Sequence, residues 1–176
     1  KMIKRSKEPA PRLRVLEDEE YDRLLKASKE VDLIYLENAF VFSIETCVRQ
    51  GELLNARWEH INFKKQTLFI PDTKTGYLSK ESTSERTIPL SKLAIITLNK
   101  LPRHISGRIF PITRDQLNQK WKLAKKKAKI KNYRWHDNRS TGISWCFEKK
   151  NLNVAEVMTI SGHRSPTILL KRYTKL

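Results

Sequence analysis

Residues 161–173 read SGHRSPTILLKRY, and this stretch predicts a tight turn between two helices. Gly162 is typical of the position just after a helix, and Pro166 is typical of the first position of the next one. His163 is therefore expected to be held in a fixed turn. Tyr173 lies ten residues further on, near the end of the second helix. Taken singly, this tyrosine fits a core aromatic residue with a satisfied hydroxyl at least as well as a functional group.

A basic pair, His136 and Arg139, stands where an earlier helix is expected to begin. Residues three apart share one face of a helix, and the first turn is the positive end of the helix dipole. Such a pair can hold a phosphate group, although a surface basic pair gives the same pattern.

Two further candidates lie in the first half of the chain. Arg49 separates two apolar helical stretches, and Glu52, three residues on, can reach back to orient it. Lys74 lies in a polar stretch between two short β-prone segments, where a mobile hairpin connection is expected. Each feature alone is ordinary, because solvated Arg-Glu pairs and solvated lysines are common.

Apolar periodicity predicts a fold that is mainly α with a small antiparallel β-sheet. The helices are expected over residues 17–29, 31–47, 50–58, 90–100, 113–128, 136–149, 153–161 and from 166 to the end, and the strands over 67–70 and 86–90, with Ile109 and Phe110 as a third. Residues 1–14 are basic, contain two prolines and lack periodicity, so they are expected to be a linker or arm. Residues 15–176 are expected to be one domain, part of a longer protein.

The charge balance points to a polyanionic partner. The 176 residues include 36 Lys and Arg against 19 Asp and Glu, a formal charge of +17, which exceeds what solubility needs. Nucleic acid is the first expectation, and a solvated basic surface or a ribosome-like structural protein is the alternative. The three lysines at 125–127, with Arg134, are expected to contact phosphates without reading the base sequence.

Other function classes find little support in the sequence. No stretch approaches the roughly 18 apolar residues of a membrane span, and no signal peptide is recognisable. Cys47 and Cys146 are the only cysteines, and they are expected to be reduced thiols in the cytoplasm of a bacterial cell. No cluster of carboxylates suggests a metal, so no cofactor is expected. His60 and His104 match no motif and are given no role.

Together, these residues resemble the tyrosine recombinase (phage integrase) family in type, order and spacing, over roughly residues 15–175. The motif positions are Arg49 within TCVRQGELL, Lys74 within TKTG before RTIPL, His136 with Arg139, the pair Gly162-His163, and Tyr173. In that family they are two arginines, a hairpin lysine, two histidines and a tyrosine nucleophile, carried by a mainly helical catalytic domain with a small sheet. All six positions are filled here.

Three supporting positions depart from the family pattern. Cys47 follows Thr46 where the family usually has Thr-Gly. Asn138 and Ser140 flank Arg139 where the family usually has Leu-Arg-His, and Ser161 stands where a leucine usually precedes Gly-His. These differences bear on the subfamily more than on the activity.

The resemblance implies that the chain cuts and rejoins double-stranded DNA. Attack on a phosphodiester builds negative charge on the nonbridging oxygens, which the planar forks of Arg49 and Arg139 are suited to grip. His163 would donate one further hydrogen bond. Tyr173 would be the nucleophile, leaving a 3′-phosphotyrosine and a free 5′ hydroxyl.

Proton transfer falls to the two remaining positions. A free tyrosine has a pKa of about 10, so its proton must leave during attack, and the resemblance makes His136 the acceptor. Lys74 would protonate the leaving 5′ oxygen. Because the phosphate ester is kept in the tyrosyl link, rejoining needs neither ATP nor a metal.

Several readings stay open at this point. The protein could be an integrase that integrates and excises a phage or mobile element. It could also be a Xer-like resolvase or a type IB topoisomerase, which use the same chemistry. A noncatalytic DNA-binding module with an incidental tyrosine is the alternative from another class. The resemblance implies a homotetramer on DNA for the full-length protein, and this domain alone is expected to bind DNA weakly and with strong salt dependence.

Overall fold

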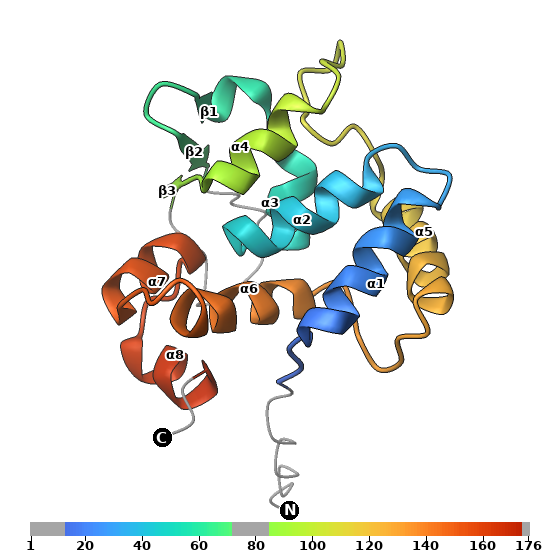
Figure 1. Ribbon diagram of the computed structural model, residues 1–176. Helices are drawn as coiled ribbons and strands as arrows, with labels where there is room; N and C mark the ends of the chain where they lie inside the picture. The colour runs from blue at the N-terminus through green and yellow to red at the C-terminus, as the bar shows by residue number, and fades with distance from the viewer. Residues whose placement is uncertain (1–12, 72–84, 174–176) are drawn as a thin grey trace, which may run out of the picture.

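The computed structural model describes residues 13–71 and 85–173 (Figure 1). Its elements are α1 (Asp18–Lys29), α2 (Leu36–Thr46), α3 (Gln50–Asn55), the 3-10 helix η1 (Trp58–His60), β1 (Ile61–Asn62), β2 (Thr67–Ile70), β3 (Arg86–Pro89), α4 (Lys92–Asn99), α5 (Arg114–Lys127), α6 (Asp137–Glu148), α7 (Val154–Ser161) and α8 (Pro166–Tyr173). The predicted class, mainly α with a small antiparallel sheet, is confirmed.

Helix α2 lies at the centre of the molecule (Figure 1). It packs against α1, α4, α5 and α6, which together cover most of its surface. Eight of its residues are buried, which explains why its sequence is apolar on most faces. An aromatic group closes this core, with Phe40 at 5.2 Å from Trp121 and Trp121 at 5.0 Å from Trp135, measured between ring centroids.

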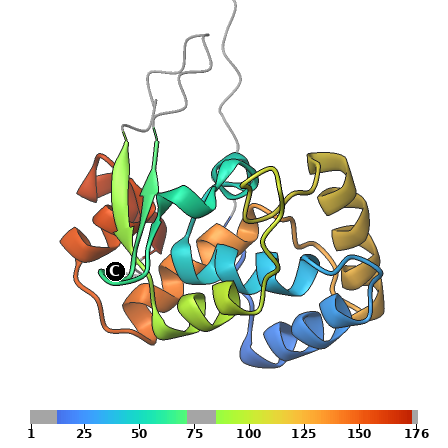
Figure 2. The same ribbon diagram turned by 90° about the horizontal axis from the view of Figure 1, so that it is seen from above.

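The three strands form one antiparallel sheet in the order β1-β2-β3. Leu68 of β2 pairs with Ile61 on one side and Ile88 on the other. Leu68 and Ile88 are buried while Phe69 and Thr87 are exposed, the alternation expected of a sheet with one covered face. Strand β3 also contacts α7, and Figure 2 shows the sheet standing beside the C-terminal helices.

The prediction of a third strand at Ile109 and Phe110 is wrong. Both residues are fully buried, but in an irregular segment, and Ile109 donates its backbone N–H to the carbonyl of Ala56. The third strand is β1 instead. A short apolar pair marks burial, and burial alone does not specify a strand.

Two predicted helices are shorter than expected. The segment before Leu36 turns instead of continuing the helix, and the backbone N–H of Leu33 bonds to the carbonyl of Val31. Helix α3 ends at Asn55, because Ala56 adopts an extended backbone. Within the described ranges, no helix is long and apolar enough to cross a membrane.

The buried apolar side chains form two clusters. The larger one joins α1–α5 and the sheet. The smaller one lies between α6, α7 and α8, and consists of Cys47, Ile143, Cys146, Val157, Ile160, Leu169 and Tyr173. Arg139 of α6 lies where the ends of α2 and α7 approach this helix.

Candidate active site

Arg49 stands immediately before α3, where it is anchored by Glu52. The backbone N–H of Arg49 donates to Glu52 Oε2 over 2.8 Å, and its Nη1 donates to Glu52 Oε1 over 3.1 Å. The predicted reach of Glu52 back to Arg49 is therefore confirmed. The Arg49 side chain remains 37% exposed while Glu52 is 6% exposed, so the carboxylate is the fixed partner and the guanidinium faces outward.

Arg86 is a third arginine of the site, and no role was predicted for it. It opens β3 and grips the same carboxylate with both ends of its guanidinium, over 3.0 Å and 2.9 Å. A Cβ placed on Gly162 would lie 3.0 Å from its Nε, so Arg86 also packs on the turn that holds His163. Arg86 is the first residue of the RTIPL segment, which follows Lys74 in the family motif. Nothing in that segment indicates an ion pair with Glu52.

Arg139 is buried and connects two loops. Its Nη1 donates to the carbonyl of Cys47 over 2.5 Å, and its Nη2 donates to the carbonyl of Ser161 over 2.6 Å. Burial, and then the positive charge of Arg49, lower the pKa of Arg139 to about 10. Because the guanidinium spans the end of α2 and the end of α7, it brings the Arg49 segment and the His163 turn to one place.

The close approach of α2 and α6 depends on two unusual backbone positions. Cys47 has a left-handed backbone, with φ of 53°, which turns its carbonyl toward Arg139. This conformation favours glycine, the residue that the family usually has here. Gly142 lies on the opposing face of α6, where an added Cβ would come within 2.2 Å of the Ile44 carbonyl. Only glycine lets the two backbones come this close.

His163 lies in the turn after α7, as predicted, and contacts Tyr173. Gly162 ends the helix with φ of 73°, and its backbone N–H donates to the Met158 carbonyl. The rings of His163 and Tyr173 meet edge to face, with centroids 6.1 Å apart. Tyr173 is only 8% exposed, since it also belongs to the smaller apolar cluster.

Of the two remaining motif residues, the structure describes His136 alone. His136 is the residue before α6, exposed, and one turn from Arg139, as the spacing predicted. Lys74 lies outside the described residues. His60 and His104 lie on other parts of the chain, and His104 is hydrogen-bonded to Ser106 in an exposed loop.

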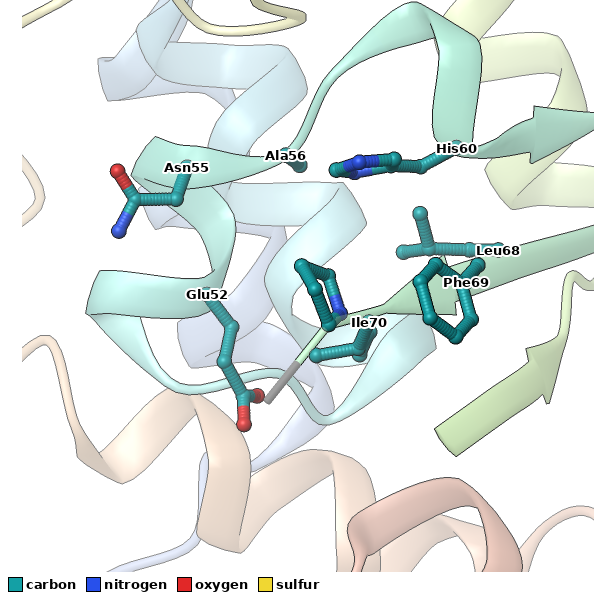
Figure 3. A pocket seen from close by; sticks show the side chains of 8 residues that line it. Glu52, Asn55, Ala56, His60, Leu68, Phe69 and Ile70 are labelled. Carbon is teal, nitrogen blue, oxygen red and sulfur yellow. The ribbon is translucent and has the colours of Figure 1, made fainter. Parts of the chain in front are cut away.

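A small, largely apolar pocket lies behind Glu52, between α3, η1 and β2 (Figure 3). Leu68 and Ile70 line it, with His60 at its far side. Figure 3 shows the Glu52 side chain directed away from His60. Glu52 therefore lies at the edge of the pocket, and its charged end belongs to the arginine cluster.

The electrostatics of the site favour an anion. Arg49, Arg86 and Arg139 interact with one another and with one carboxylate, Glu52. Three positive charges against one negative charge leave an excess that a phosphate would neutralise. Among the described residues, no group of histidine, cysteine and carboxylate side chains is arranged to hold a metal ion.

Comparisons with known proteins identify the family of the chain. Residues 14–176 match the model of the phage integrase family. The shufflon-specific DNA recombinase of Escherichia coli is 36% identical over 175 residues, which cover 99% of this chain and 43% of that protein. The chain thus spans less than half the length of this relative.

Two solved structures share the fold. The lambda integrase dimer bound to a COC′ core site has a TM-score of 0.74 at 20% identity, covering 97% of this chain and 50% of that one. The catalytic domain of bacteriophage HP1 integrase has a TM-score of 0.69 at 20% identity, covering 92% of this chain and 87% of that one. With the family match extending over nearly the whole sequence, the chain belongs to the phage integrase family of tyrosine recombinases.

Proposed function

We propose that the chain cleaves and rejoins one strand of duplex DNA at a specific site, through a covalent bond between Tyr173 and a 3′ phosphate. The observation that carries the proposal is the double hydrogen bond of Arg139 to the carbonyls of Cys47 and Ser161. These two bonds hold the Arg49 segment and the His163 turn close together. The site they form has a net positive charge and lies beside the Tyr173 ring.

In the proposed step the scissile phosphate lies between Arg49, Arg139 and His163. These groups donate to the nonbridging oxygens, whose charge grows as the phosphorus is attacked. The Tyr173 oxygen forms the new bond to phosphorus, and the bond to the 5′ oxygen breaks. Tyr173 is mostly buried and belongs to the smaller apolar cluster, so the attack requires its side chain to become accessible to the DNA.

The proposed proton transfers use the two remaining motif residues. His136 accepts the tyrosine proton, and Lys74 gives a proton to the leaving 5′ oxygen. Rejoining is the reverse of these transfers, with a 5′ hydroxyl attacking the phosphotyrosine. The ester energy is conserved throughout, so the chemistry uses no ATP and no metal.

We infer the wider setting from the relatives. Structures of lambda integrase hold a dimer on a COC′ core site and a tetramer on a Holliday junction. By likeness, the full-length protein would act as a homotetramer on two duplexes in the bacterial cytoplasm. Integration and excision are the first candidate outcome of the reaction.

A reaction like that of the shufflon-specific DNA recombinase is a second candidate, because this relative is 36% identical to the chain. Strand exchange between two sites on one DNA gives excision when the sites are in direct orientation and inversion when they are in inverted orientation. A plasmid carrying the recovered site twice, in direct and in inverted orientation, would separate them when supplied with the full-length protein.

Covalent capture tests the chemistry itself. The chain is incubated with a library of nicked duplexes of randomised sequence, in which the short fragment released by cleavage diffuses away, and protein-DNA adducts are recovered after denaturation. Tyr35→Phe is the matched control, because Tyr35 precedes α2, far in sequence from the site. Adducts with the wild type and Tyr35→Phe, and none with Tyr173→Phe, would support the proposal.

The opposite results are equally informative. Adducts that persist with Tyr173→Phe would refute the assigned nucleophile. DNA binding without adducts from any sequence in the library would favour a noncatalytic DNA-binding module.

A further inference from the structure

The hydroxyl of Ser161 lies 2.7 Å from Nδ1 of His163. The left-handed backbone of Gly162 between them makes this contact possible, because it folds the chain back over the end of α7. Ser161 is fully buried, so its hydroxyl has no access to water. Side chains two positions apart do not meet within a regular helix, and the contact is therefore a product of this turn.

The direction of this hydrogen bond follows from the surroundings of Ser161. A buried hydroxyl proton needs an acceptor, because an unmet hydrogen-bond donor in the protein interior is destabilising. Within residues 13–71 and 85–173, Nδ1 of His163 is the partner found for this oxygen. Donation by Ser161 requires a lone pair on Nδ1, which places the ring proton of neutral His163 on Nε2.

We propose that Ser161 is a positioning residue for His163, whose hydroxyl holds the imidazole in the orientation and tautomer that present an N–H from Nε2. This inference rests on the proposed function for its purpose, since His163 is there the donor to a nonbridging phosphate oxygen. It goes beyond that function by naming the group that prepares the donor before DNA arrives.

The backbone of Ser161 also takes part in the site. Its carbonyl accepts the Nη2 bond of Arg139, while its side chain meets His163. One buried residue thus fixes two of the proposed phosphate ligands relative to each other. The edge of the Tyr173 ring packs against His163 and further limits how the imidazole can turn.

The hydroxyl of Ser161 is a departure from the usual family pattern. The family usually has leucine at this position, and a leucine side chain has no group that could bond to Nδ1. The backbone link to Arg139 needs only a carbonyl, which any residue supplies. The side-chain link to His163 needs the hydroxyl.

Nitrogen-15 NMR of the histidine rings tests the proposal without any DNA. The chain has four histidines, and His163→Gln identifies the resonances of His163. At alkaline pH the wild type should show the Nε2–H tautomer with Nδ1 shifted as a hydrogen-bond acceptor. Ser161→Ala should move the Nδ1 resonance toward that of an unbonded nitrogen, and Thr159→Ala, which removes an exposed hydroxyl of the same helix, should leave it unchanged.

Two outcomes of this measurement would overturn the proposal. One is a proton on Nδ1 of His163 in the wild type, and the other is a His163 spectrum that Ser161→Ala does not alter. Ser161→Cys is a second variant for the same comparison. A thiol is similar in size to a hydroxyl but is a weak hydrogen-bond donor, so this variant should also shift the Nδ1 resonance toward that of an unbonded nitrogen.

Cleavage provides the functional arm. Loss of one neutral hydrogen bond that orients the donor should slow adduct formation about threefold to tenfold in Ser161→Ala and Ser161→Cys, with DNA affinity kept. If the wild type cleaves and both variants match it, the positioning role is refuted. If no variant and no wild type cleaves, the proposed function fails while the NMR result still decides the state of His163.

Discussion

Arg86 and Glu52 form a largely buried ion pair in which Nη1 donates to Oε1 over 3.0 Å and Nη2 donates to Oε2 over 2.9 Å. The same carboxylate accepts the backbone N–H and the side chain of Arg49. Glu52 therefore joins β3 to the start of α3 and sets the position of an arginine proposed to bind phosphate. Its removal should affect both the fold and the site.

Glu52→Gln should lower the free energy of unfolding by about 3 kcal/mol, because it leaves the buried charge of Arg86 without its counter-charge. Urea unfolding at neutral pH measures this change. Glu59→Gln is the matched control, since Glu59 pairs with Arg57 at the surface, with exposed fractions of 66% and 40%, and should change stability by less than about 0.5 kcal/mol. Equal effects of the two substitutions would show that the buried pair contributes nothing special.

The same pair predicts how stability depends on pH. Burial opposes ionisation of Glu52, but the hydrogen bonds and charges of Arg86 and Arg49 outweigh it and hold the pKa of this carboxyl below its usual range. A pKa lowered by folding stabilises the protein fully above the unfolded value of about 4.3, and this stabilisation disappears as the pH falls through the folded value. The difference in unfolding free energy between wild type and Glu52→Gln should therefore shrink below about pH 4.

The two proteins are compared because Glu20 also contributes to the pH dependence of stability. Arg14 lowers the pKa of Glu20 in a similar way. Both proteins share that contribution, so subtraction removes it. A difference that stays constant from neutral pH down to acid unfolding would contradict the assignment to Glu52.

The sequence predicted the local features of the site well. The turn at Gly162 and the reach of Glu52 to Arg49 depend on neighbours within a few residues, and local chemistry decides them. The order of the six motif residues also placed the chain in its family. Those residues were found as a set, since each one alone resembled an ordinary surface or core residue.

The long-range contacts could not be predicted in this way. Arg86 and Glu52 are 34 positions apart, and nothing in either segment marks the pairing. Arg139 and the Cys47 carbonyl to which it donates are 92 positions apart, and neither segment marks this contact either. Partners such as these are fixed by packing of distant elements, which periodicity does not encode.

Gly142→Ala should destabilise the chain by about 1–3 kcal/mol, because the new Cβ would meet the Ile44 carbonyl at 2.2 Å and the Cys47 Sγ at 2.9 Å. Pushing α6 from α2 would also stretch the bond from Arg139 to Cys47. The free energy of unfolding, measured in urea, and the rate of adduct formation should both fall. Gly51→Ala in α3 is the control, since its nearest neighbour would be 3.8 Å away, and it should be neutral or slightly stabilising.

Arg139→Lys should slow adduct formation by about 100-fold or more, because an ammonium cannot span the two carbonyls and still face a phosphate. DNA affinity should fall much less, since the charge is kept. Single-turnover cleavage and fluorescence anisotropy measure the two effects, with the exposed Arg108→Lys as a control that should change neither. A cleavage rate within about twofold of wild type would mean that the fork geometry of Arg139 is unimportant.

The lysines at 125–127 were expected to contact DNA phosphates, and the structure distinguishes among them. Lys125 donates to the Tyr133 carbonyl over 2.6 Å, and Lys127 pairs with Glu30 over 3.1 Å. Lys126 is exposed on the same helix. We therefore expect Lys126→Ala to weaken DNA binding equally on unrelated sequences, and to reduce the slope of log affinity against log salt by about 1.

Lys149→Ala provides the comparison, because Lys149 pairs with Asp18 and lies 3.7 Å from the centre of the Trp145 ring. An amine held by a carboxylate and an aromatic face has less to gain from a phosphate, so the salt slope should stay as in the wild type. Anisotropy titrations over a range of salt concentrations measure both slopes. If Lys149→Ala reduces the slope and Lys126→Ala does not, DNA crosses the α1 and α6 side of the molecule instead of α5, and the prediction made from the lysine run is wrong.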